Sequence, residues 1–505
     1  MEETAYGRDG GQRALDRDER ARLGARAAAL AAELAGRDVA AVALTWVDIS
    51  GITRTKAVPV ARLEHAATWG VGMSPVFDAF LLDDSIVSGR YVGGPVGDLR
   101  LHPDLDRLVP LPALPGWALA PALRYAQDGT VHPLDTRALL RREVARLAAL
   151  GWSALTAFEV EWTVSEGDGG GFRPASGGPA YGMTRISELA GYLRDLLQAL
   201  DASGVAVEQI HPEYAAGQYE LSVAAEDPVG AADTAVLVRE TIRAVSLEHG
   251  FVASFSPKVE ADSVGNGGHI HLSLWQGDPT AAGTAADGAA AGTAGTGAGA
   301  TGAGGPAGGA AVNVMAGGDG PYGMTGAGEA FAAGILDRLP ALLAVGAPSV
   351  ASYLRLIPSH WAGAYACWGL ENREAALRFV AGADGERARA ANLEIKCFDP
   401  AANPYLALAA LLAAGRAGIG AEAELPEPVD LDPGALSADA RADRGIIALP
   451  SSLEESVAAF EADPALREAL GEAVIDTVAV VRRGEIELLD GATPEEITAA
   501  TRWRH

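Results

Sequence analysis

Two glutamates separated by one residue inside an apolar segment set the first condition on the fold. Glu159 and Glu161 lie in FEVEW, which follows the β-prone residues SALTA. Residues two apart on a strand project from the same face, so the two carboxylates would stand side by side. Like charges placed in this way repel each other and resist burial unless a cation joins them. A strand with a solvated polar face is the alternative for this pair taken alone.

Two further segments carry acidic or imidazole side chains in a similar pattern. Glu213 and Glu220 flank a glycine-containing turn in HPEYAAGQYELSV, before an apolar strand. His269 and His271 alternate in GNGGHIHLSLW, where the preceding glycines would let the backbone approach a ligand closely. A His-x-His alternation is also common in structural and zinc sites.

The segment ANLEIKCFDPAANPYL adds Glu394 and Lys396 on one strand face, followed by a turn and a helix. Carboxylates with a single imidazole suit Mg2+ or Mn2+ better than a thiolate-rich zinc site does. Two such ions close together could bridge phosphate oxygens, which is the usual need of ATP-driven ligation.

Composition excludes several other classes of protein. The 505 residues are 49% hydrophobic, enough for a large core, and the net charge of −27 disfavours binding to nucleic acid. Cys367 and Cys397 cannot build a disulfide framework, and the charged N-terminus does not resemble a signal peptide. Because the long apolar stretches are interrupted by charges, we predict no membrane span and a cytoplasmic protein.

Helix and turn signals divide the chain into two domains. Residues 14–36 favour an amphipathic helix closed by Gly36, and two β-prone runs around Gly51 favour a hairpin. We therefore expect a small β-containing domain over 14–125. A helix introduced by PLDTR then leads into the FEVEW strand and opens a larger domain over 130–505.

Two segments have the composition of disordered chain. Residues 1–13 are predicted to be disordered, and residues 277–318 consist almost entirely of Gly, Ala and Thr without periodicity. Strand and helix patterns resume on both sides of 277–318, so we predict a surface insertion within one domain. Deletion of Thr280 to Ala310 should be tolerated.

In this order, the motifs resemble those of the glutamine synthetase family, bacterial type I class. The matching blocks are FEVEW, HPEYAAGQYE, GGHIHLSL, SYLRLIP, ENREAALR and LEIKCFDPAANPYL. They extend from the DISG turn at Asp48 to beyond NPYL, nearly the whole chain. The resemblance implies an α+β fold, with an N-terminal β-grasp-like domain and a C-terminal catalytic domain whose curved antiparallel sheet forms a funnel. It also implies a homo-dodecamer of two hexameric rings.

The resemblance also implies roles for individual residues. One metal would be held by Glu161, Glu213 and Glu220, and a second, near the nucleotide phosphates, by Glu159, His269 and Glu394. ATP would contact His271, Ser273 and Arg378. Arg373 and Arg378 would neutralise charge during phosphoryl transfer. Glutamate would be held at its α-carboxylate by Arg355, with Gly265 and Lys396 also at the substrate.

The implied reaction begins with attack of the glutamate γ-carboxylate on ATP, giving γ-glutamyl phosphate. An amine then displaces phosphate through a tetrahedral adduct, without a covalent enzyme intermediate. Orientation and charge neutralisation are the dominant contributions to catalysis of phosphoryl transfer.

Departures from the family pattern concern the ammonium site. Three residues beyond Pro358, where ammonia-using members place a flap glutamate, this chain has Trp361. The aspartate-glycine-serine block of those members is replaced by LLDDSIVSG, in which Asp83 or Asp84 is the candidate equivalent. The proton acceptor would then be His360 or one of these aspartates.

Other departures concern the acid substrate and regulation. Lys396 and Asn392 stand where many members have arginines, so the acid is held differently or is not glutamate. The segment GAEAELPEPVDLDP lacks the tyrosine that is adenylylated in regulated members, which predicts that this control is absent.

Retained metal residues with an altered ammonium site resemble the γ-glutamyl-amine ligases, which act on polyamines, ethanolamine or other alkylamines. Trp361, Tyr365 and Trp368 could contact an alkyl chain or a cationic amine, or could simply pack in a buried loop. We identify no extra carboxylates for a polyamine and therefore favour a small alkylamine such as ethanolamine. The alternatives are a glutamine synthetase using ammonia, a γ-glutamylpolyamine synthetase, and an inactive member with a structural or regulatory role.

Overall fold

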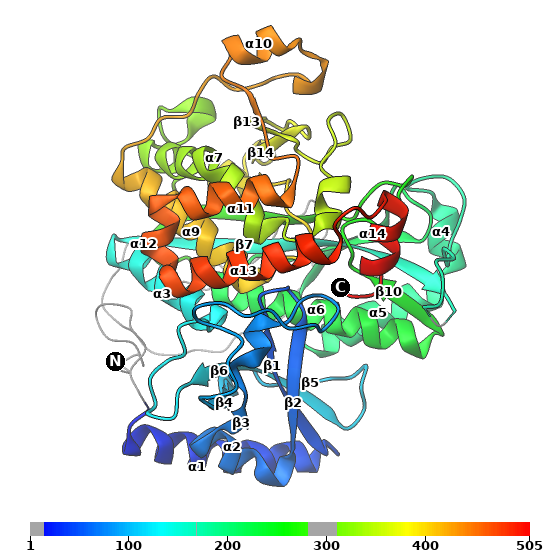
Figure 1. The fold of residues 1–505 in the computed structure, drawn as a ribbon, viewed down its shortest axis with the longest axis vertical. Coiled ribbons are helices and arrows are strands. Elements are labelled where there is room, and N and C mark those ends of the chain that lie inside the picture. Colours follow the sequence, from blue (N-terminus) through cyan, green and yellow to red (C-terminus); the bar gives the residue numbers. More distant parts are fainter. Residues whose placement is uncertain (1–14, 168, 281–310) are drawn as a thin grey trace.

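The computed structural model of the chain describes residues 15–167, 169–280 and 311–505. It has a small N-terminal domain beneath a larger C-terminal domain, and helices pack on the sheets of both (Figure 1). The predicted disordered segment 1–13 lies outside the described residues. Within the described ranges, no helix has the length and apolar character needed to cross a membrane.

The N-terminal domain is a mixed sheet with two helices against it, which matches the expected β-grasp-like arrangement (Figure 1). The strand order is β2-β1-β6-β4-β3, with β5 beside β6; β1 pairs antiparallel with β2 and parallel with β6. Its strands are β1 Ala41–Val47, β2 Thr53–Pro59, β3 Val71–Met73, β4 Leu99–Pro103, β5 Val109–Pro110 and β6 Trp117–Tyr125, and its α-helices are α1 Arg17–Gly36 and α2 Leu63–Trp69.

Helix α1 begins at a side-chain cap and ends before a residue in the left-handed conformation. The Asp16 carboxylate accepts hydrogen bonds from the backbone N–H groups of Asp18 and Glu19, which an N-terminus otherwise leaves unpaired. The predicted cap at Gly36 is wrong. Gly36 is the last helical residue, and the left-handed conformation that stops the helix falls on Asp38, at φ 58°.

The turn of the predicted β1–β2 hairpin joins the two domains. Gly51 has φ +80°, and a Cβ atom there would lie 1.9 Å from the carbonyl oxygen of Ala401. The Asn403 side chain donates hydrogen bonds to the carbonyls of Val47 (3.1 Å) and Asp48 (3.0 Å). Only glycine leaves room for the Ala401 carbonyl at this position. The Asn403 hydrogen bonds fix the hairpin against the catalytic domain.

The C-terminal domain is built around one large sheet in the order β16-β13-β14-β15-β11-β7-β9-β8, with β10 beside β7 and β12 beside β11. The predicted antiparallel pairing is confirmed except between β13 and β14, which run parallel with a register shift. The strands are β7 Trp152–Glu166, β8 Val207–Pro212, β9 Gln218–Val223, β10 Phe251–Ser254, β11 Gly268–Gln276, β12 Val312–Asn313, β13 Tyr365–Leu370, β14 Ala375–Val380, β15 Asn392–Ile395 and β16 Ile447–Ala448.

Helices cover this sheet and complete the core. Helix α9 is apolar and almost wholly buried; Asn403 caps its N-terminus and Pro404 follows at its first position. The α-helices are α3 Thr136–Ala149, α4 Met183–Glu188, α5 Ala190–Ala202, α6 Pro228–Glu248, α7 Gly326–Gly346, α8 Arg387–Ala390, α9 Pro404–Gly420, α10 Ala438–Asp443, α11 Leu453–Ala462, α12 Pro464–Leu470, α13 Glu472–Leu488 and α14 Pro494–Thr501.

The predicted insertion at 277–318 is too long at its C-terminal end. Residues 281–310 lie outside the described residues, but 311–318 are described and contain β12. This strand pairs antiparallel with β11, with Val312 opposite Gln276. Met315 is fully buried in the main core. The few apolar residues of AVNVMA thus anchor this part of the chain by burying Val314 and Met315 in the core.

Candidate functional site

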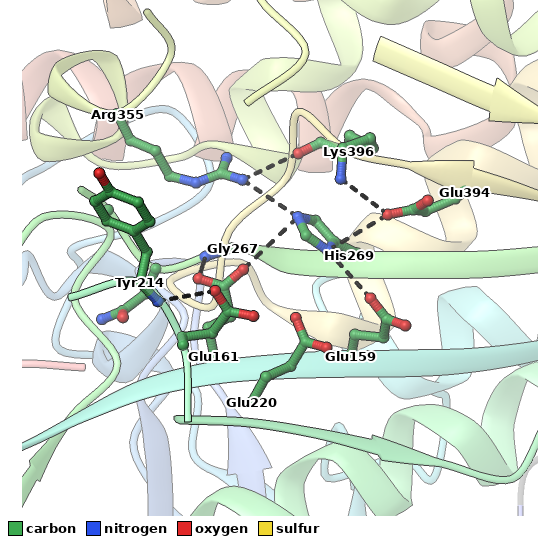
Figure 2. A network of polar contacts seen from close by, with 12 residues as sticks. Glu159, Glu161, Tyr214, Glu220, Gly267, His269, Arg355, Glu394 and Lys396 are labelled. Carbon is green, nitrogen blue, oxygen red and sulfur yellow. Dashed lines mark hydrogen bonds and ion pairs between the residues drawn. The ribbon is translucent and has the colours of Figure 1, made fainter. Parts of the chain in front are cut away.

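Polar residues of the central strands line up across the sheet because the strand register places them opposite one another. The facing pairs are Glu161 and Glu220, Glu159 and His269, and His271 and Glu394. Figure 2 shows these carboxylates gathered around His269. Directly opposed carboxylates repel, so this register is costly unless cationic groups or metal ions lie between them.

Imidazoles connect the carboxylates at the centre of the group. His269 Nδ1 lies 3.2 Å from Glu159 Oε2 and 3.5 Å from Glu394 Oε1, and its Nε2 lies 4.0 Å from Glu161 Oε1. His271 Nε2 lies 3.2 Å from Glu159 Oε1. The structure therefore brings together side chains from β7, β11 and β15.

Glu161 is held in place by hydrogen-bond donors. Its Oε2 accepts from the backbone N–H of Gly267 (2.8 Å) and from Gln218 Nε2 (2.9 Å). A Cβ at Gly267 would lie 2.5 Å from His269 Nε2, so the glycine lets the backbone approach the cluster. Gln218 was not among the predicted residues, because its position beside Glu161 depends on the pairing of β7 with β9.

Burial and neighbouring charges have opposing effects on the pKa values of Glu159 and His271, whereas burial dominates for Glu161. Burial raises the pKa of Glu161. Burial also acts to raise the pKa of Glu159, but the charge of His271 outweighs it and holds that pKa well below its usual range. For His271, burial opposes the charged form, yet Glu159 raises its pKa to about 9. The raised pKa favours the charged form of His271, which can balance part of the negative charge of the carboxylates.

Another group of possible ligand atoms, from His211, Glu213 and Glu220, lies where β8 and β9 meet. His211 Nε2 is 3.1 Å from Glu220 Oε1, and His211 Nδ1 is 3.5 Å from Glu213 Oε1. The hydrogen bond to Glu220 raises the pKa of His211 to about 9, while burial raises the pKa of Glu220 to about 7. Sequence reasoning missed His211, although it precedes Glu213 by two residues, the spacing that puts residues on one strand face.

The described residues include three groups whose ligand atoms lie within 4.8 Å of one another and could hold a metal ion. Carboxylate oxygens with imidazole nitrogens suit Mg2+ or Mn2+. The donor set therefore fits divalent cations, and all six predicted metal residues contribute to it or contact it. The groups are Glu159, His271 and Glu394; Glu159, Glu220 and His269; and His211, Glu213 and Glu220.

Cationic side chains border the cluster at its Glu394 end. Lys396 Nζ lies 3.0 Å from Glu394 Oε1, and Arg378 Nη1 lies 2.8 Å from Glu394 Oε2. Burial acts to raise the pKa of Glu394, but Lys396 outweighs it and the pKa falls far below its usual range. These cations could also meet anionic substrate groups.

Arg355 adds a buried guanidinium on the opposite side of His269 from Glu159 (Figure 2). Its Nη2 lies 3.4 Å from His269 Nε2 and donates to the carbonyl of Lys396 at 3.1 Å. Its Nη1 is buried and has no hydrogen-bond partner among the described residues. A Cβ at Gly265 would lie 2.7 Å from Arg355 Cγ, so the glycine makes room for this arginine. An unpaired buried donor suits an anionic ligand.

Three residues predicted to contact the nucleotide or its phosphates differ in their distance from the cluster: His271, Ser273 and Arg373. His271 Nδ1 lies 2.9 Å from Asn392 Oδ1, at the position where the family pattern has an arginine. Ser273 Oγ accepts a hydrogen bond from Trp275 Nε1 at 2.8 Å. Arg373 is exposed in the turn before β14, outside the contacts of the cluster.

The two aspartates of LLDDSIVSG do not join the cluster within the described part of this single chain. The Asp83 carboxylate accepts hydrogen bonds from the N–H and hydroxyl of Ser85. Asp84 has φ 69° and lies 2.7 Å from the Arg54 guanidinium. Both are N-terminal-domain residues; the contacts of Asp83 are local, whereas Asp84 also lies 3.7 Å from the Arg504 guanidinium of the C-terminal domain.

The aromatic residues of SHWAGAYACWG divide into one exposed and two buried side chains. Trp361 is 58% exposed, and its backbone N–H donates to Glu374 Oε1 at 2.8 Å. Trp368 donates to the carbonyl of Pro426, and Tyr365 packs in a small apolar cluster. Plain packing therefore accounts for Tyr365 and Trp368, and only Trp361 can meet a ligand.

Comparison with known proteins covers both domains. Residues 133–297 and 308–499 match the family model "Glutamine synthetase, catalytic domain", and residues 27–135 match "Glutamine synthetase N-terminal domain". The chain is 52% identical to "Gamma-glutamylpolyamine synthetase GlnA3" of Streptomyces coelicolor, covering 95% of this chain and 97% of that protein.

Two other similar proteins extend this result. A "Glutamate--methylamine ligase" of Methyloversatilis universalis is 29% identical, over 85% of this chain and 88% of its own length. A solved structure described as "Crystal structure of novel glutamine synthase homolog" has a TM-score of 0.76 at 32% identity, covering 91% of this chain and 97% of its own. The chain therefore belongs to the glutamine synthetase family and is a ligase of that family.

Proposed function

We propose that this protein uses ATP to join the γ-carboxyl group of glutamate to an amine larger than ammonia. The observation that carries this proposal is the pairing of a retained carboxylate and imidazole cluster with an exposed Trp361 at the flap position. The missing flap carboxylate removes a charge that favours ammonium, and an indole offers apolar contact to carbon atoms.

The chain's own residues would divide the work between the two ends of the cluster. Arg355, with its unpaired Nη1, would hold the α-carboxylate of glutamate. Arg378 and Arg373 would neutralise charge as the γ-phosphoryl group moves to the γ-carboxylate. The amine would then attack the acyl carbon, form the amide bond with loss of a proton, and displace inorganic phosphate. Mg2+ or Mn2+ bound by the cluster would neutralise phosphate charge.

A polyamine is the first candidate for the amine. The 52% identical relative is named a γ-glutamylpolyamine synthetase, which outweighs our preference for ethanolamine from the sequence alone. The net charge of −27 also attracts a polycation. A small alkylamine such as ethanolamine is the second candidate, supported by the relative named glutamate–methylamine ligase.

The proposal is tested by identifying the product. The protein is incubated with ATP, Mg2+, glutamate and one amine at a time: ammonia, ethanolamine, putrescine or spermidine. We expect mass spectrometry to detect the γ-glutamyl derivative of an alkylamine, with one phosphate released per amide. Phosphate release that does not depend on glutamate would show ATP hydrolysis uncoupled from ligation and contradict the proposal, and glutamine as the main product would show an ordinary glutamine synthetase.

We further propose that the active assembly is the homo-dodecamer of two hexameric rings expected from the family resemblance. In such rings, sites are shared between neighbouring subunits, which would give Asp83 and Asp84 a route to a neighbour's site. Mass photometry of the purified protein tests this: a twelve-subunit species supports the assembly, and a stable monomer with full activity contradicts it.

A further inference from the structure

Two exposed tyrosines flank the carboxylate of Glu213 at the edge of the cluster. Tyr181 is 50% exposed and Tyr214 is 61% exposed. The Tyr181 hydroxyl donates to Glu213 Oε2 at 2.8 Å, and the backbone N–H of Tyr214 donates to the same oxygen at 3.1 Å. The backbone of Tyr214 is therefore tied to the cluster while its ring stays uncovered.

The Tyr214 ring itself has no hydrogen-bond or ring partner within residues 15–167, 169–280 and 311–505. Among the described residues, the structure shows neither a hydrogen bond to its hydroxyl nor a ring or cation–π contact to its face. Figure 2 shows the ring on the side of Arg355, away from Glu394 and Lys396. An aromatic face left open at that side of a carboxylate cluster is available to a ligand.

A buried arginine fixes the backbone that carries this ring. Arg185 is 3% exposed; its Nη1 donates to the carbonyls of Glu213 (2.6 Å) and Ala215 (2.5 Å), and its Nη2 to those of Gly178 (2.8 Å) and Tyr214 (3.3 Å). One guanidinium thus joins two loops through backbone carbonyls. Such multiple attachment restricts the orientation of the turn before any ligand arrives.

Gln218 links the same turn to the centre of the cluster. Its Oε1 accepts from the backbone N–H of Ala215 at 3.0 Å, and its Nε2 donates to Glu161 Oε2 at 2.9 Å. The position of Tyr214 relative to the carboxylates is therefore set by hydrogen bonds on both sides of the turn. Because the backbone of this turn is already fixed, contact with a substrate would restrict only the side chain of Tyr214.

We propose that Tyr214 is a specificity-determining residue for the acceptor amine and that Arg185 is the positioning residue that holds it. The ring contacts the carbon chain or the charged end of an alkylamine, while the neighbouring carboxylates attract its ammonium group. Ammonia has no carbon atoms and gains nothing from this ring. The inference rests on the proposed function, since it presupposes that the acceptor is an alkylamine.

The test measures the ratio of kcat/KM for putrescine to kcat/KM for ammonia in purified variants. Tyr214→Ala should lower this ratio about tenfold, chiefly through KM for putrescine, as expected for the loss of one ring contact. Tyr214→Phe keeps the ring and should retain the ratio. Leu247→Ala removes an equally exposed apolar side chain from the end of α6 and should leave the ratio unchanged.

Arg185 is tested through its dependence on Tyr214. If Arg185 acts by holding Tyr214, the effects of Arg185→Lys and Tyr214→Ala on the ratio will not add in the double variant. Additive effects would overturn the positioning role, because a purely structural arginine would lower both efficiencies independently of Tyr214.

The outcomes separate this inference from the proposed function. An unchanged ratio in Tyr214→Ala, or an equal loss for both amines, overturns the role of Tyr214 while the wild type still prefers putrescine. A wild type that prefers ammonia to every alkylamine overturns the proposed function, and this inference with it.

Discussion

Glu161 combines burial, a facing carboxylate and two fixed hydrogen-bond donors, a combination that has no structural advantage unless a cation binds there. We predict that Glu161→Ala abolishes amine-dependent phosphate release and weakens Mn2+ binding measured by calorimetry, while circular dichroism stays unchanged. Glu166→Ala, at the exposed end of the same strand, is the matched control and should behave as wild type. Near-wild-type turnover in Glu161→Ala would contradict the metal assignment.

Arg378 is the cationic partner of Glu394 across β14 and β15. We predict that Arg378→Lys lowers kcat by about 10² to 10³, because lysine keeps the charge but loses the fork that meets a transferring phosphoryl group. Steady-state kinetics with varied ATP measures the effect. A change confined to KM for ATP would instead make Arg378 a residue that binds ground state and transition state equally.

For individual residues, the sequence predicts which side chains share one strand face better than it predicts which side chains meet across different strands. The shared strand face of Glu159 and Glu161 follows from the two-residue period of β7, whereas their expected metal role came from the family resemblance. The roles of Gln218 and Arg185 cannot be predicted locally because they depend on which strand or loop lies opposite them, whereas His211 has a local signal in its two-residue spacing from Glu213. For Tyr365 and Trp368 the sequence leaves ligand contact and plain packing both open, because aromatic composition does not reveal burial; the structure shows that both are buried.

Among the secondary-structure elements, the β1–β2 turn packs so closely on the catalytic domain that one added Cβ atom at Gly51 would disrupt the contact. We predict that Gly51→Ala lowers the free energy of unfolding by at least about 3 kcal/mol, since a Cβ at Gly51 would clash with the Ala401 carbonyl. Gly151→Ala is the matched control, because Gly151 also has positive φ but has open space around it, so it should cost only about 1 kcal/mol. Equal melting temperatures for the two variants would show that the turn moves freely.

Element positions were predicted well where local signals agree, as in the β1–β2 hairpin and the strand carrying FEVEW. The predicted helix end at Gly36 agrees with the last residue of α1, although Asp38 rather than Gly36 carries the left-handed conformation. The predicted end of the insertion at residue 318 failed because a tertiary contact decides it: β12 pairs with β11, and the described chain resumes at residue 311. Backbone pairing over a long sequence separation leaves no local signature.

For the whole molecule, replacing the segment between β11 and β12 tests whether this part of the chain is needed for activity or assembly. Gln276 and Val312 are paired neighbours in the sheet, so a short turn can replace the residues between them. We predict that exchanging residues 281–310 for a four-residue Gly/Ser linker leaves activity and subunit number unchanged, since loop length costs little closure entropy. Loss of the oligomer on size-exclusion chromatography would show that this segment takes part in assembly.

The central claim is that the acceptor is an amine larger than ammonia, with Trp361 at the flap. The most direct measurement compares kcat/KM for ammonia, ethanolamine, putrescine and spermidine in the wild type and in Trp361→Glu. We predict that the wild type prefers an alkylamine, with putrescine or spermidine above ethanolamine, and that Trp361→Glu shifts the preference toward ammonia. A wild type whose best substrate is ammonia would contradict the claim.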